Sequence, residues 1–438
     1  MQRTWCRPLP AADLLIQGGR VVDPGTGADG VQDVLITAGE IAKVGPGLVA
    51  PQRTRVVDAA GMLVLPGFVD LHAHFRAPGR EDEEDLGTAS AAAAAGGYVA
   101  AFGMPNTEPV TDSAGLLRGL IRQAEEDAVV PLGFYGAVTR GLGGDLLTEM
   151  GELGEAGAVG FSDDGNALPT AAIIRRALQY AKVADRLVAV HAEDPSLSLG
   201  GQMHEGAASA RLGLTGIPSL CESLDVFRTL DIAAYEDGRV HVCHVSAEQS
   251  LQAIARAKEA GVRVTAEVTP HHLTLVDERV ATFDPNFKMN PPLRAERDRR
   301  ALVEALKSGL VDCVATDHAP HAPEAKDLPF EEAPFGVIGL ETAFSVLYGA
   351  LVVSGEVPLA TLIARMSTTP ARIAGLEAPS VAAGAVANVC VVDPLAVWTV
   401  APDTLKSRSH NTPWLGQELT AKVRLTVAAG RVAWDDLA

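Results

Sequence analysis

Two histidines and an arginine lie close together in the segment Asp-Leu-His-Ala-His-Phe-Arg (70–76), directly after an apolar run at 62–69. On a β-strand, side chains alternate between the two faces, so His72, His74 and Arg76 would project to one side. Burying two imidazoles and a guanidinium without partners is costly. A divalent metal with an anionic group beside it would offset that cost. A pair of hydrogen-bonded core histidines is the alternative interpretation.

Polar residues that could bind a metal also follow other apolar runs of the chain. We predict eight strands, at residues 63–71, 98–103, 132–138, 158–161, 187–190, 240–242, 262–268 and 311–315. Most of the eleven histidines lie just after these runs, together with Asn106, Thr139, Asp163, Asp164 and Asp317. Loops that merely face solvent would show no preference for histidine. The distribution therefore favours a metal site.

Helical segments separate most of these strands, for example at 170–185, 247–260 and 295–308. Strands that alternate with helices are typical of repeated βα units. Eight such units predict an α/β fold with a (β/α)8 TIM-type barrel. The active site of such a barrel lies at the carboxyl ends of its strands, which is where the histidines occur.

The two ends of the chain show a different pattern, with short strands separated by Gly, Pro and Asp turns. We expect strands at 14–17, 33–37, 41–44 and 55–57, and again at 388–392, 418–427 and 431–434. These segments predict one small β-sandwich domain that is formed from both chain ends, residues 1–65 and 377–438. The barrel, residues 66–376, would be inserted between them.

Composition and charge limit the function. The chain has 438 residues with 47% hydrophobic content, enough for a large core and more than one domain. The formal net charge is −19 and no basic face is visible, so we expect no nucleic-acid partner. An acidic small substrate stays compatible with this charge, because a metal and one arginine reverse the sign locally.

The cysteines and the N-terminal segment bear on the compartment. The five cysteines form no Cys-x-x-Cys pair, which argues against a disulfide framework or a cysteine-zinc site. The first ten residues lack the apolar core of a signal peptide, and no stretch is long enough to span a bilayer. We therefore predict a cytoplasmic protein that does not bind membranes.

Candidate metal ligands are the side chains that follow a strand and can converge. Borderline metals such as zinc accept imidazole nitrogen and carboxylate oxygen. The candidates are His72, His74, His191, His244 and Asp317, plus one of Asp163 and Asp164. Five or six ligands exceed what one catalytic zinc with an open position uses, which favours two metals. No lysine follows the strand at 158–161, so we expect a carboxylate to bridge them.

Seven segments carry a family resemblance. They are 70–76, Gly-Met-Pro-Asn-Thr (103–107), Gly-Phe-Ser-Asp-Asp-Gly (160–165), His-Ala-Glu-Asp (191–194), His-Val-Ser (244–246), Asn-Pro-Pro-Leu-Arg (290–294) and Ala-Thr-Asp-His-Ala-Pro-His (315–321). Together they resemble the amidohydrolase superfamily and, within it, the bacterial class I dihydroorotases. The resemblance runs from about residue 13 to the C-terminus. It implies a zinc enzyme that interconverts N-carbamoyl-L-aspartate and (S)-dihydroorotate in pyrimidine (UMP) synthesis.

The resemblance also implies a role for each matching position. His72, His74 and Asp317 would bind one Zn²⁺, His191 and His244 the second, and Asp164 would bridge the two. Asp317 would also be the catalytic residue that transfers protons. The substrate-contacting positions would be His74, Arg76, Asn106, Asn290 and His321, with Phe335 and Gly336 acting through the backbone.

Two other functions are compatible with parts of this pattern. A hydantoinase or allantoinase would typically carry a modified lysine, which is absent here. A non-catalytic subunit that only scaffolds aspartate transcarbamoylase would be expected to lose metal ligands, and all six are present. We expect a homo-oligomer that acts on a small acidic substrate, with association with aspartate transcarbamoylase compatible with activity. The acidic, proline-containing segment 322–334 is interpreted as a loop over the site.

Overall fold

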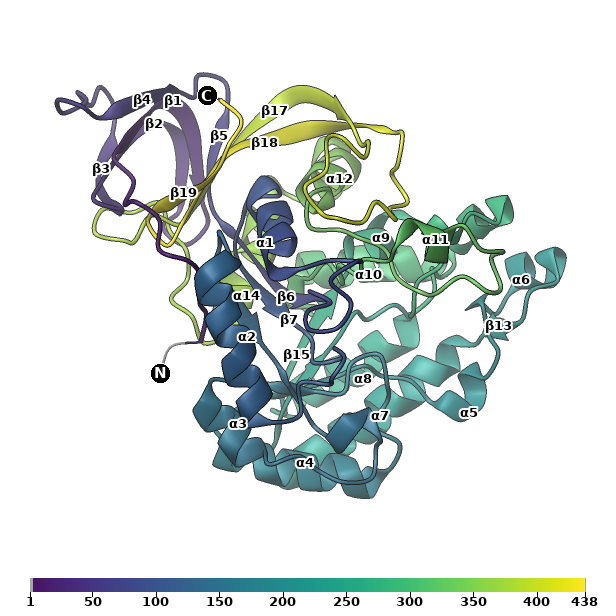
Figure 1. Cartoon of the computed structure of the whole chain (residues 1–438). Coiled ribbons are helices and arrows are strands. Elements are labelled where there is room, and N and C mark those ends of the chain that lie inside the picture. Colours follow the sequence, from purple (N-terminus) through teal and green to yellow (C-terminus); the bar gives the residue numbers. More distant parts are fainter. Residues whose placement is uncertain (1–2, 438) are drawn as a thin grey trace.

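Parallel strands make up the middle of the chain in the computed structural model, which describes residues 3–437 (Figure 1). They are β6 (Phe68–Ala73), β7 (Tyr98–Gly103), β8 (Leu132–Phe134), β9 (Gly136–Ala137), β10 (Phe161–Ser162), β11 (Val188–Val190), β14 (Arg239–Val242), β15 (Arg263–Val268) and β16 (Cys313–Val314). These strands pair in the orders β6-β7-β8 and β9-β10-β11-β14-β15-β16. The α/β class predicted from the alternating pattern is confirmed.

Backbone hydrogen bonds also connect the two parallel sheets. Between β8 and β9, the Tyr135 N–H donates to the carbonyl of Gly103 across a distance of 2.9 Å. At the other end, Ala73 forms a parallel bridge with His318, and the His74 N–H donates to the carbonyl of His318 (2.8 Å). The segment that follows β16 therefore pairs with β6, the first of the parallel strands.

Helices follow most of the parallel strands and cover them on the outside (Figure 1). They are α1 (Leu86–Ala95), α2 (Ala114–Asp127), α3 (Met150–Ala156), α4 (Ala171–Val183), α5 (Pro195–Ser198), α6 (Ala207–Leu212), α7 (Ser219–Glu236), α8 (Glu248–Glu259), α9 (Pro270–Thr274), α10 (Glu296–Ser308), α11 (Pro323–Lys326), α12 (Ala343–Leu347), α13 (Leu359–Met366) and α14 (Thr368–Ile373). Shorter turns are the 3₁₀ segments Arg140–Leu142, Asp277–Thr282 and Pro285–Phe287 and the π segment Tyr348–Val353. A small two-stranded sheet pairs β12 (Met203–His204) with β13 (Gly216–Ile217).

Helix α4 shows why these segments are helical. The side chain of Thr170 accepts a hydrogen bond from the Ile173 N–H and so caps the first turn. The buried residues Ile173, Ala177 and Ala181 recur at a spacing of four, which places them on one face of the helix. Helices α4, α8 and α10 confirm the helices predicted at 170–185, 247–260 and 295–308.

The two ends of the chain pair in a separate, mostly antiparallel sheet. Its strands are β1 (Leu14–Asp23), β2 (Ala28–Thr37), β3 (Glu40–Gly45), β4 (Arg55–Asp58), β5 (Leu63–Pro66), β17 (Val389–Thr399), β18 (Glu418–Ala428) and β19 (Arg431–Asp435). The order is β19-β18-β17-β5-β1-β2-β3, with β4 beside β1. The antiparallel pair β5–β17 joins the purple and yellow parts of Figure 1.

The expected single strand at 63–71 is wrong, because the structure splits it between the two sheets. Strand β5 belongs to the terminal sheet and β6 to the parallel sheets, with Gly67 between them. A Cβ atom at Gly67 would lie 2.2 Å from a methyl carbon of Val99, so only glycine fits there. Pro66 offers no backbone N–H to continue a ladder. The predicted strand at 132–138 is likewise divided, at Tyr135, into β8 and β9.

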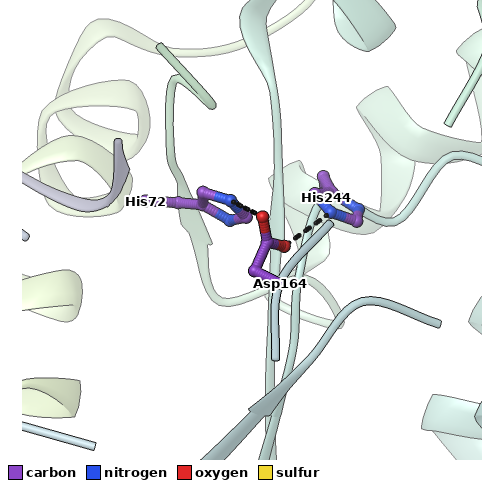
Figure 2. Close-up of side chains that lie close together, drawn as sticks. All are labelled: His72, Asp164 and His244. Atoms are coloured by element: carbon purple, nitrogen blue, oxygen red, sulfur yellow. Dashed lines mark ion pairs between the residues drawn. The ribbon is translucent and has the colours of Figure 1, made fainter. Parts of the chain in front are cut away.

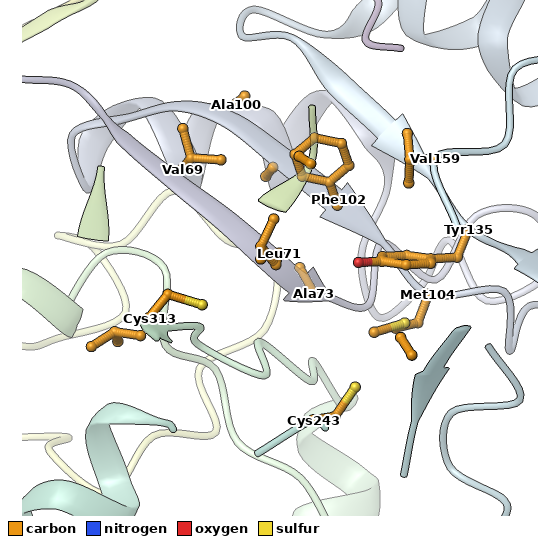
Figure 3. Packing of buried hydrophobic residues seen from close by; sticks show 14 of the residues in the cluster. Val69, Leu71, Ala73, Ala100, Phe102, Met104, Tyr135, Val159, Cys243 and Cys313 are labelled. Atoms are coloured by element: carbon orange, nitrogen blue, oxygen red, sulfur yellow. The ribbon is translucent and has the colours of Figure 1, made fainter. Parts of the chain in front are cut away.

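Apolar side chains fill both parts of the molecule. Figure 3 shows Val69, Leu71 and Ala73 of β6 packed beside Ala100 and Phe102 of β7. A separate apolar cluster lies under the terminal sheet. All five cysteines are free thiols. Within residues 3–437, no helix combines the length and apolar character needed to cross a membrane.

Candidate metal centre

Six side chains converge at the carboxyl ends of the parallel strands. His72 lies in β6 and His74 follows it, while the other four come after β10, β11, β14 and β16. The six are His72, His74, Asp164, His191, His244 and Asp317, and each is at most 7% exposed. These are the six residues that the sequence predicts as metal ligands.

Asp164 lies at the centre of this cluster (Figure 2). Its Oδ2 atom is 3.3 Å from His72 Nε2 and 3.5 Å from His74 Nε2. Its Oδ1 atom is 3.4 Å from His244 Nε2 and 3.7 Å from His191 Nδ1. One carboxylate therefore faces two pairs of histidines with its two oxygens, which is the arrangement that a bridging ligand requires.

Asp317 completes the side of the cluster formed by His72 and His74. Its Oδ1 atom lies 3.1 Å from His74 Nε2 and 3.5 Å from His72 Nε2. On the other side, His191 Nδ1 and His244 Nε2 are 3.0 Å apart. His72, His74 and Asp317 offer ligand atoms that all lie within 4.8 Å of one another, and so do His72, Asp164 and His244.

Three of the four histidines donate a hydrogen bond away from the cluster. His72 Nδ1 donates to Glu267 Oε1 (2.7 Å), and His74 Nδ1 donates to Asn106 Oδ1 (2.9 Å). These bonds leave the Nε2 lone pairs of both rings directed toward Asp164. A neutral imidazole that donates through one nitrogen accepts through the other.

His191 is also oriented by a hydrogen bond to a neighbouring carboxylate, but it uses Nε2 where His72 and His74 use Nδ1. Its Nε2 atom donates to Glu193 Oε2 (2.9 Å), so the Nδ1 lone pair faces Asp164. In the described part of the chain, His72 Nε2 and Asp164 Oδ1 have no hydrogen-bond partner although both are buried. Buried lone pairs that face carboxylate oxygens at this distance repel unless a cation lies among them. The donor set therefore fits a metal.

The electrostatics of the cluster keep its carboxylates ionised. Burial raises the pKa of Asp164, but positive charge among the four histidines, carried by a proton on His72 where no cation binds, outweighs burial and holds that pKa well below its usual range. For Asp317, burial is likewise outweighed by His72 and His74, so its pKa is also lowered. Ionised carboxylates are the form that binds a metal and the form that accepts a proton.

Three residues of this region adopt the left-handed backbone region. The φ angles are 59° at Arg76, 32° at His244 and 50° at Asp317. This region is unfavourable for residues other than glycine and concentrates at functional sites. The strain agrees with a site whose side-chain directions are imposed by the surrounding fold.

A cavity of about 230 Å³ opens beside the six side chains. Its lining residues are His74, Arg76, Asn106, Asp164, Gly165, His191, His244, Asn290, Asp317, Ala319, His321, Phe335 and Gly336. Every predicted substrate-contacting residue is among them. The structure therefore brings the predicted substrate positions and the predicted metal ligands to one cavity.

Arg76 supplies positive charge to this cavity. Its Nε atom donates to the carbonyl of Pro320 (2.9 Å) and lies 3.3 Å from Glu83 Oε2. Burial lowers the pKa of Arg76 to about 10, so the guanidinium stays charged at neutral pH. His321 lies beside it, with Nε2 donating to the carbonyl of Phe335 (2.8 Å) and Nδ1 3.4 Å from Glu83.

The structure separates the two adjacent aspartates that the strand-end pattern left open. Asp163 accepts hydrogen bonds from the Val138 and Thr139 N–H groups (2.8 and 3.0 Å) and from the Thr139 hydroxyl. It thus joins neighbouring loops, whereas Asp164 faces the histidines.

Sequence reasoning missed the acidic side chains around the cluster, namely Glu83, Glu193 and Glu267. Glu267 had a visible signal, since it is a charged residue inside the predicted buried strand 262–268. His72 and His241 outweigh the effect of burial and lower its pKa to about 2. Glu193 also binds Asn290, whose Nδ2 donates to Glu193 Oε2 (2.7 Å).

Comparison with known proteins identifies the family. Residues 61–250 match the family model described as "Dihydro-orotase-like". The chain is 44% identical to the dihydroorotase of Geobacter metallireducens, over 96% of this chain and 99% of the relative. It is 45% identical to the dihydroorotase of Anaeromyxobacter dehalogenans (strain 2CP-1), over 97% of this chain and 98% of the relative. The chain belongs to the dihydroorotase family.

Solved structures with the same fold extend this comparison. L-hydantoinase from Arthrobacter aurescens aligns with a TM-score of 0.86 at 24% identity, over 97% of this chain and 96% of that chain. D-hydantoinase from Thermus sp. aligns with a TM-score of 0.81 at 26% identity, over 97% of this chain and 95% of that chain. This member of the dihydroorotase family therefore shares its α/β fold with hydantoinases.

Proposed function

We propose that the protein is a dihydroorotase, which reversibly interconverts N-carbamoyl-L-aspartate and (S)-dihydroorotate. The observation that carries the proposal is the Asp164-centred cluster of four histidines beside a cavity that also contains the Arg76 guanidinium. The cluster around Asp164 suits metal-assisted hydrolysis of an amide, and the Arg76 guanidinium suits a substrate with a carboxylate. Full-length identity of 44–45% to proteins named dihydroorotase supports the same reaction.

The metal we propose is zinc, with two ions per subunit. His72, His74 and Asp317 would hold one ion, His191 and His244 the other, and Asp164 would bridge them. Histidine and carboxylate ligands are those that zinc accepts in catalytic sites. When bound, zinc lowers the pKa of a water ligand to about 7 and polarises a carbonyl oxygen.

Asp317 is the proposed proton carrier. Its carboxylate is ionised, lines the cavity and lies at the carboxyl end of β16, so it can accept a proton from the attacking water. In ring opening, it then donates that proton to the ring nitrogen that leaves the cyclised carbonyl carbon. In ring closure, the carboxylate accepts the proton from the ureido nitrogen, which follows from microscopic reversibility.

Arg76 is proposed to hold the substrate carboxylate. A guanidinium presents two parallel N–H groups to a carboxylate and stays charged across the physiological range. Asn106, Asn290 and His321 line the same cavity, as do Phe335 and Gly336, and we assign them to substrate contact. Their geometry would orient the ring so that its amide carbon faces the metals.

The structure gives less support to the two alternatives. Hydantoinases and allantoinases typically use a modified lysine, whereas the described residues that line the cavity include an aspartate and no lysine. A subunit that only scaffolds a partner would not need to keep all six predicted metal ligands. The retained set favours an active enzyme.

The remaining predictions concern architecture and context. We infer that the parallel strands close into the predicted (β/α)8 barrel, supported by the Ala73–His318 bridge and the hydantoinase alignments. The terminal sheet would be the small β-sandwich domain, and Pro66 and Gly67 would mark its first boundary with the barrel. A homo-oligomer and association with aspartate transcarbamoylase stay predictions, as does the cytoplasmic location expected from the cysteines and the N-terminal segment.

A substrate comparison tests the proposed function. The zinc-loaded protein is assayed with dihydroorotate, hydantoin and allantoin, and the ring-opened products are measured. We expect turnover of dihydroorotate and a much lower kcat/KM for both other amides. Arg76→Met should raise KM for dihydroorotate, because the carboxylate loses its bidentate partner. Preferential turnover of hydantoin or allantoin would contradict the proposal.

A further inference from the structure

The connection between β17 and β18, residues 400–417, belongs to the terminal sheet but extends toward the catalytic cavity. Figure 1 shows this yellow segment passing beside α12 toward α11. In this connection, the Ser409 hydroxyl donates a hydrogen bond to the carbonyl of Glu83 (2.7 Å). The Arg408 N–H donates to Glu84 Oε1 (3.1 Å). The terminal domain is thus attached to the segment that follows β6.

Asn411 makes the contacts closest to the cavity, and it is 5% exposed. Its Oδ1 atom accepts a hydrogen bond from the His321 N–H (3.1 Å). Its Nδ2 atom donates to the carbonyls of Ala319 (3.0 Å) and Gly336 (3.1 Å). One carboxamide therefore satisfies three backbone groups on two separate segments.

The three groups bound by Asn411 belong to residues that line the catalytic cavity. Ala319, His321 and Gly336 all contribute to that lining, whereas Asn411 itself does not. Asn411 lines a second cavity of about 490 Å³ on the other side of His321. It therefore reaches the catalytic cavity only through the segments it holds.

The two segments have little freedom to move closer together. Gly336 has a φ angle of 126°, and a Cβ atom there would lie 2.8 Å from the Ala319 Cβ. Close contact between Gly336 and Ala319 keeps the two segments from approaching further. The hydrogen bonds of the Asn411 carboxamide keep them from moving apart. Only asparagine combines one acceptor and two donors at this side-chain length.

We propose that Asn411 is a positioning residue for substrate binding, which holds His321 and Gly336 at the distance that the carboxylate-bearing ring requires. This inference rests on the proposed function, since it assumes that these residues contact dihydroorotate. Within residues 3–437, Asn411 forms its side-chain hydrogen bonds with His321, Ala319 and Gly336 and with no predicted metal ligand, so its loss should affect substrate binding more than the chemical step.

The test measures kcat and KM for dihydroorotate in Asn411→Ala and Asn411→Asp, with Asn388→Ala as the matched control. Asn388 also accepts a hydrogen bond from a distant backbone group, the Ala429 N–H (2.7 Å), but it lies in the terminal domain. We expect KM to rise about tenfold in both Asn411 variants while kcat changes less than about threefold, since small misplacement of binding groups costs up to roughly a hundredfold. Asn388→Ala should lower Tm and leave KM unchanged.

The two Asn411 variants protect the test against a folding defect. Asn411→Asp keeps the acceptor for the His321 N–H but turns a carboxylate oxygen toward two carbonyls, so it should raise KM even if Asn411→Ala fails to fold. As a second readout, inhibition by dihydrouracil, the same ring without the carboxylate, should change less than KM.

Two outcomes would overturn the inference. A KM within twofold of the wild-type value in the folded Asn411 variants, with a loss of Tm alone, would reduce Asn411 to a structural role. Absence of dihydroorotate turnover by the wild-type, zinc-loaded chain would overturn the proposed function and this inference with it. The wild-type measurement therefore distinguishes the two failures.

Discussion

The two sides of the metal centre hold their histidines with different kinds of carboxylate. On one side, His72 donates to Glu267, which is 195 residues away and 1% exposed. On the other, His191 donates to Glu193, which is two residues away and has a side chain that is 19% exposed. The same chemical pairing is built once by the tertiary fold and once by local sequence.

The partners of the two glutamates differ as well. Glu267 also accepts from His241 Nε2 (2.9 Å), so both of its oxygens bind buried imidazoles. Glu193 accepts from Asn290, a residue of the cavity wall, and from the hydroxyl of Ser198. The His72 side is therefore held by buried hydrogen bonds within the protein interior. The His191 side is linked through Glu193 to Asn290, which lines the substrate cavity. We therefore expect Glu267 to govern stability and metal affinity, and Glu193 to couple metal binding to substrate.

Asp164→Ala should have the largest effect, because it removes the carboxylate that both sides share. We expect metal content to fall from two ions per chain to nearly none. Activity should drop by more than the roughly 10²–10⁴-fold that a single acid–base group supplies. Elemental analysis measures the metal content, and dihydroorotate turnover measures the activity. Asp163→Asn is the neighbouring control and should retain its metals; equal metal loss in the two variants would remove Asp164 from its bridging position.

Asp317→Asn tests a residue that contacts only the His72 and His74 side of the metal centre. The amide cannot accept the proton from water, so we expect kcat to fall by roughly 10²–10⁴-fold while the fold is kept. Circular dichroism and steady-state kinetics are the measurements. A variant that keeps a large share of wild-type turnover would exclude Asp317 from proton transfer.

Glu267→Gln addresses the interior side. Its amide group would place a donor against one of two imidazole N–H groups in a buried site, which costs about 1–3 kcal/mol of folding free energy. We expect metal affinity to fall by about 10–100-fold, the usual effect of losing such a supporting carboxylate. Chelator competition and denaturant unfolding measure these changes.

Glu193→Gln should have the smallest effect of the series. Because the site is partly exposed, water can replace the lost interaction, and we expect metal affinity to fall by less than about tenfold. KM for dihydroorotate should change at the same time, since Asn290 loses a charged partner. Equal losses of metal affinity in Glu193→Gln and Glu267→Gln would contradict the difference between the two sides.

Much of the fold and the site was predictable because the signals are local. Strand periodicity indicated that His72, His74 and Arg76 share a surface, and the strand-end positions of His191, His244 and Asp317 followed from alternating apolar and helical segments. The strands within each chain end were also predictable from their short alternating patterns, whereas the pairing of β5 with β17 joins segments hundreds of residues apart. Local signals of this kind depend on residues a few positions apart.

The chain by itself determined which residue types stand at the strand ends, and hence that a metal-dependent chemistry is available. The strand-end pattern left open which of Asp163 and Asp164 faces the histidines, and only the tertiary structure decided that Glu267 and Asn411 support the site. The physical reason is distance along the chain. Periodicity sets the face on which a side chain lies, whereas contacts between elements up to hundreds of residues apart, such as Glu267 with His72, depend on how whole sheets and loops pack.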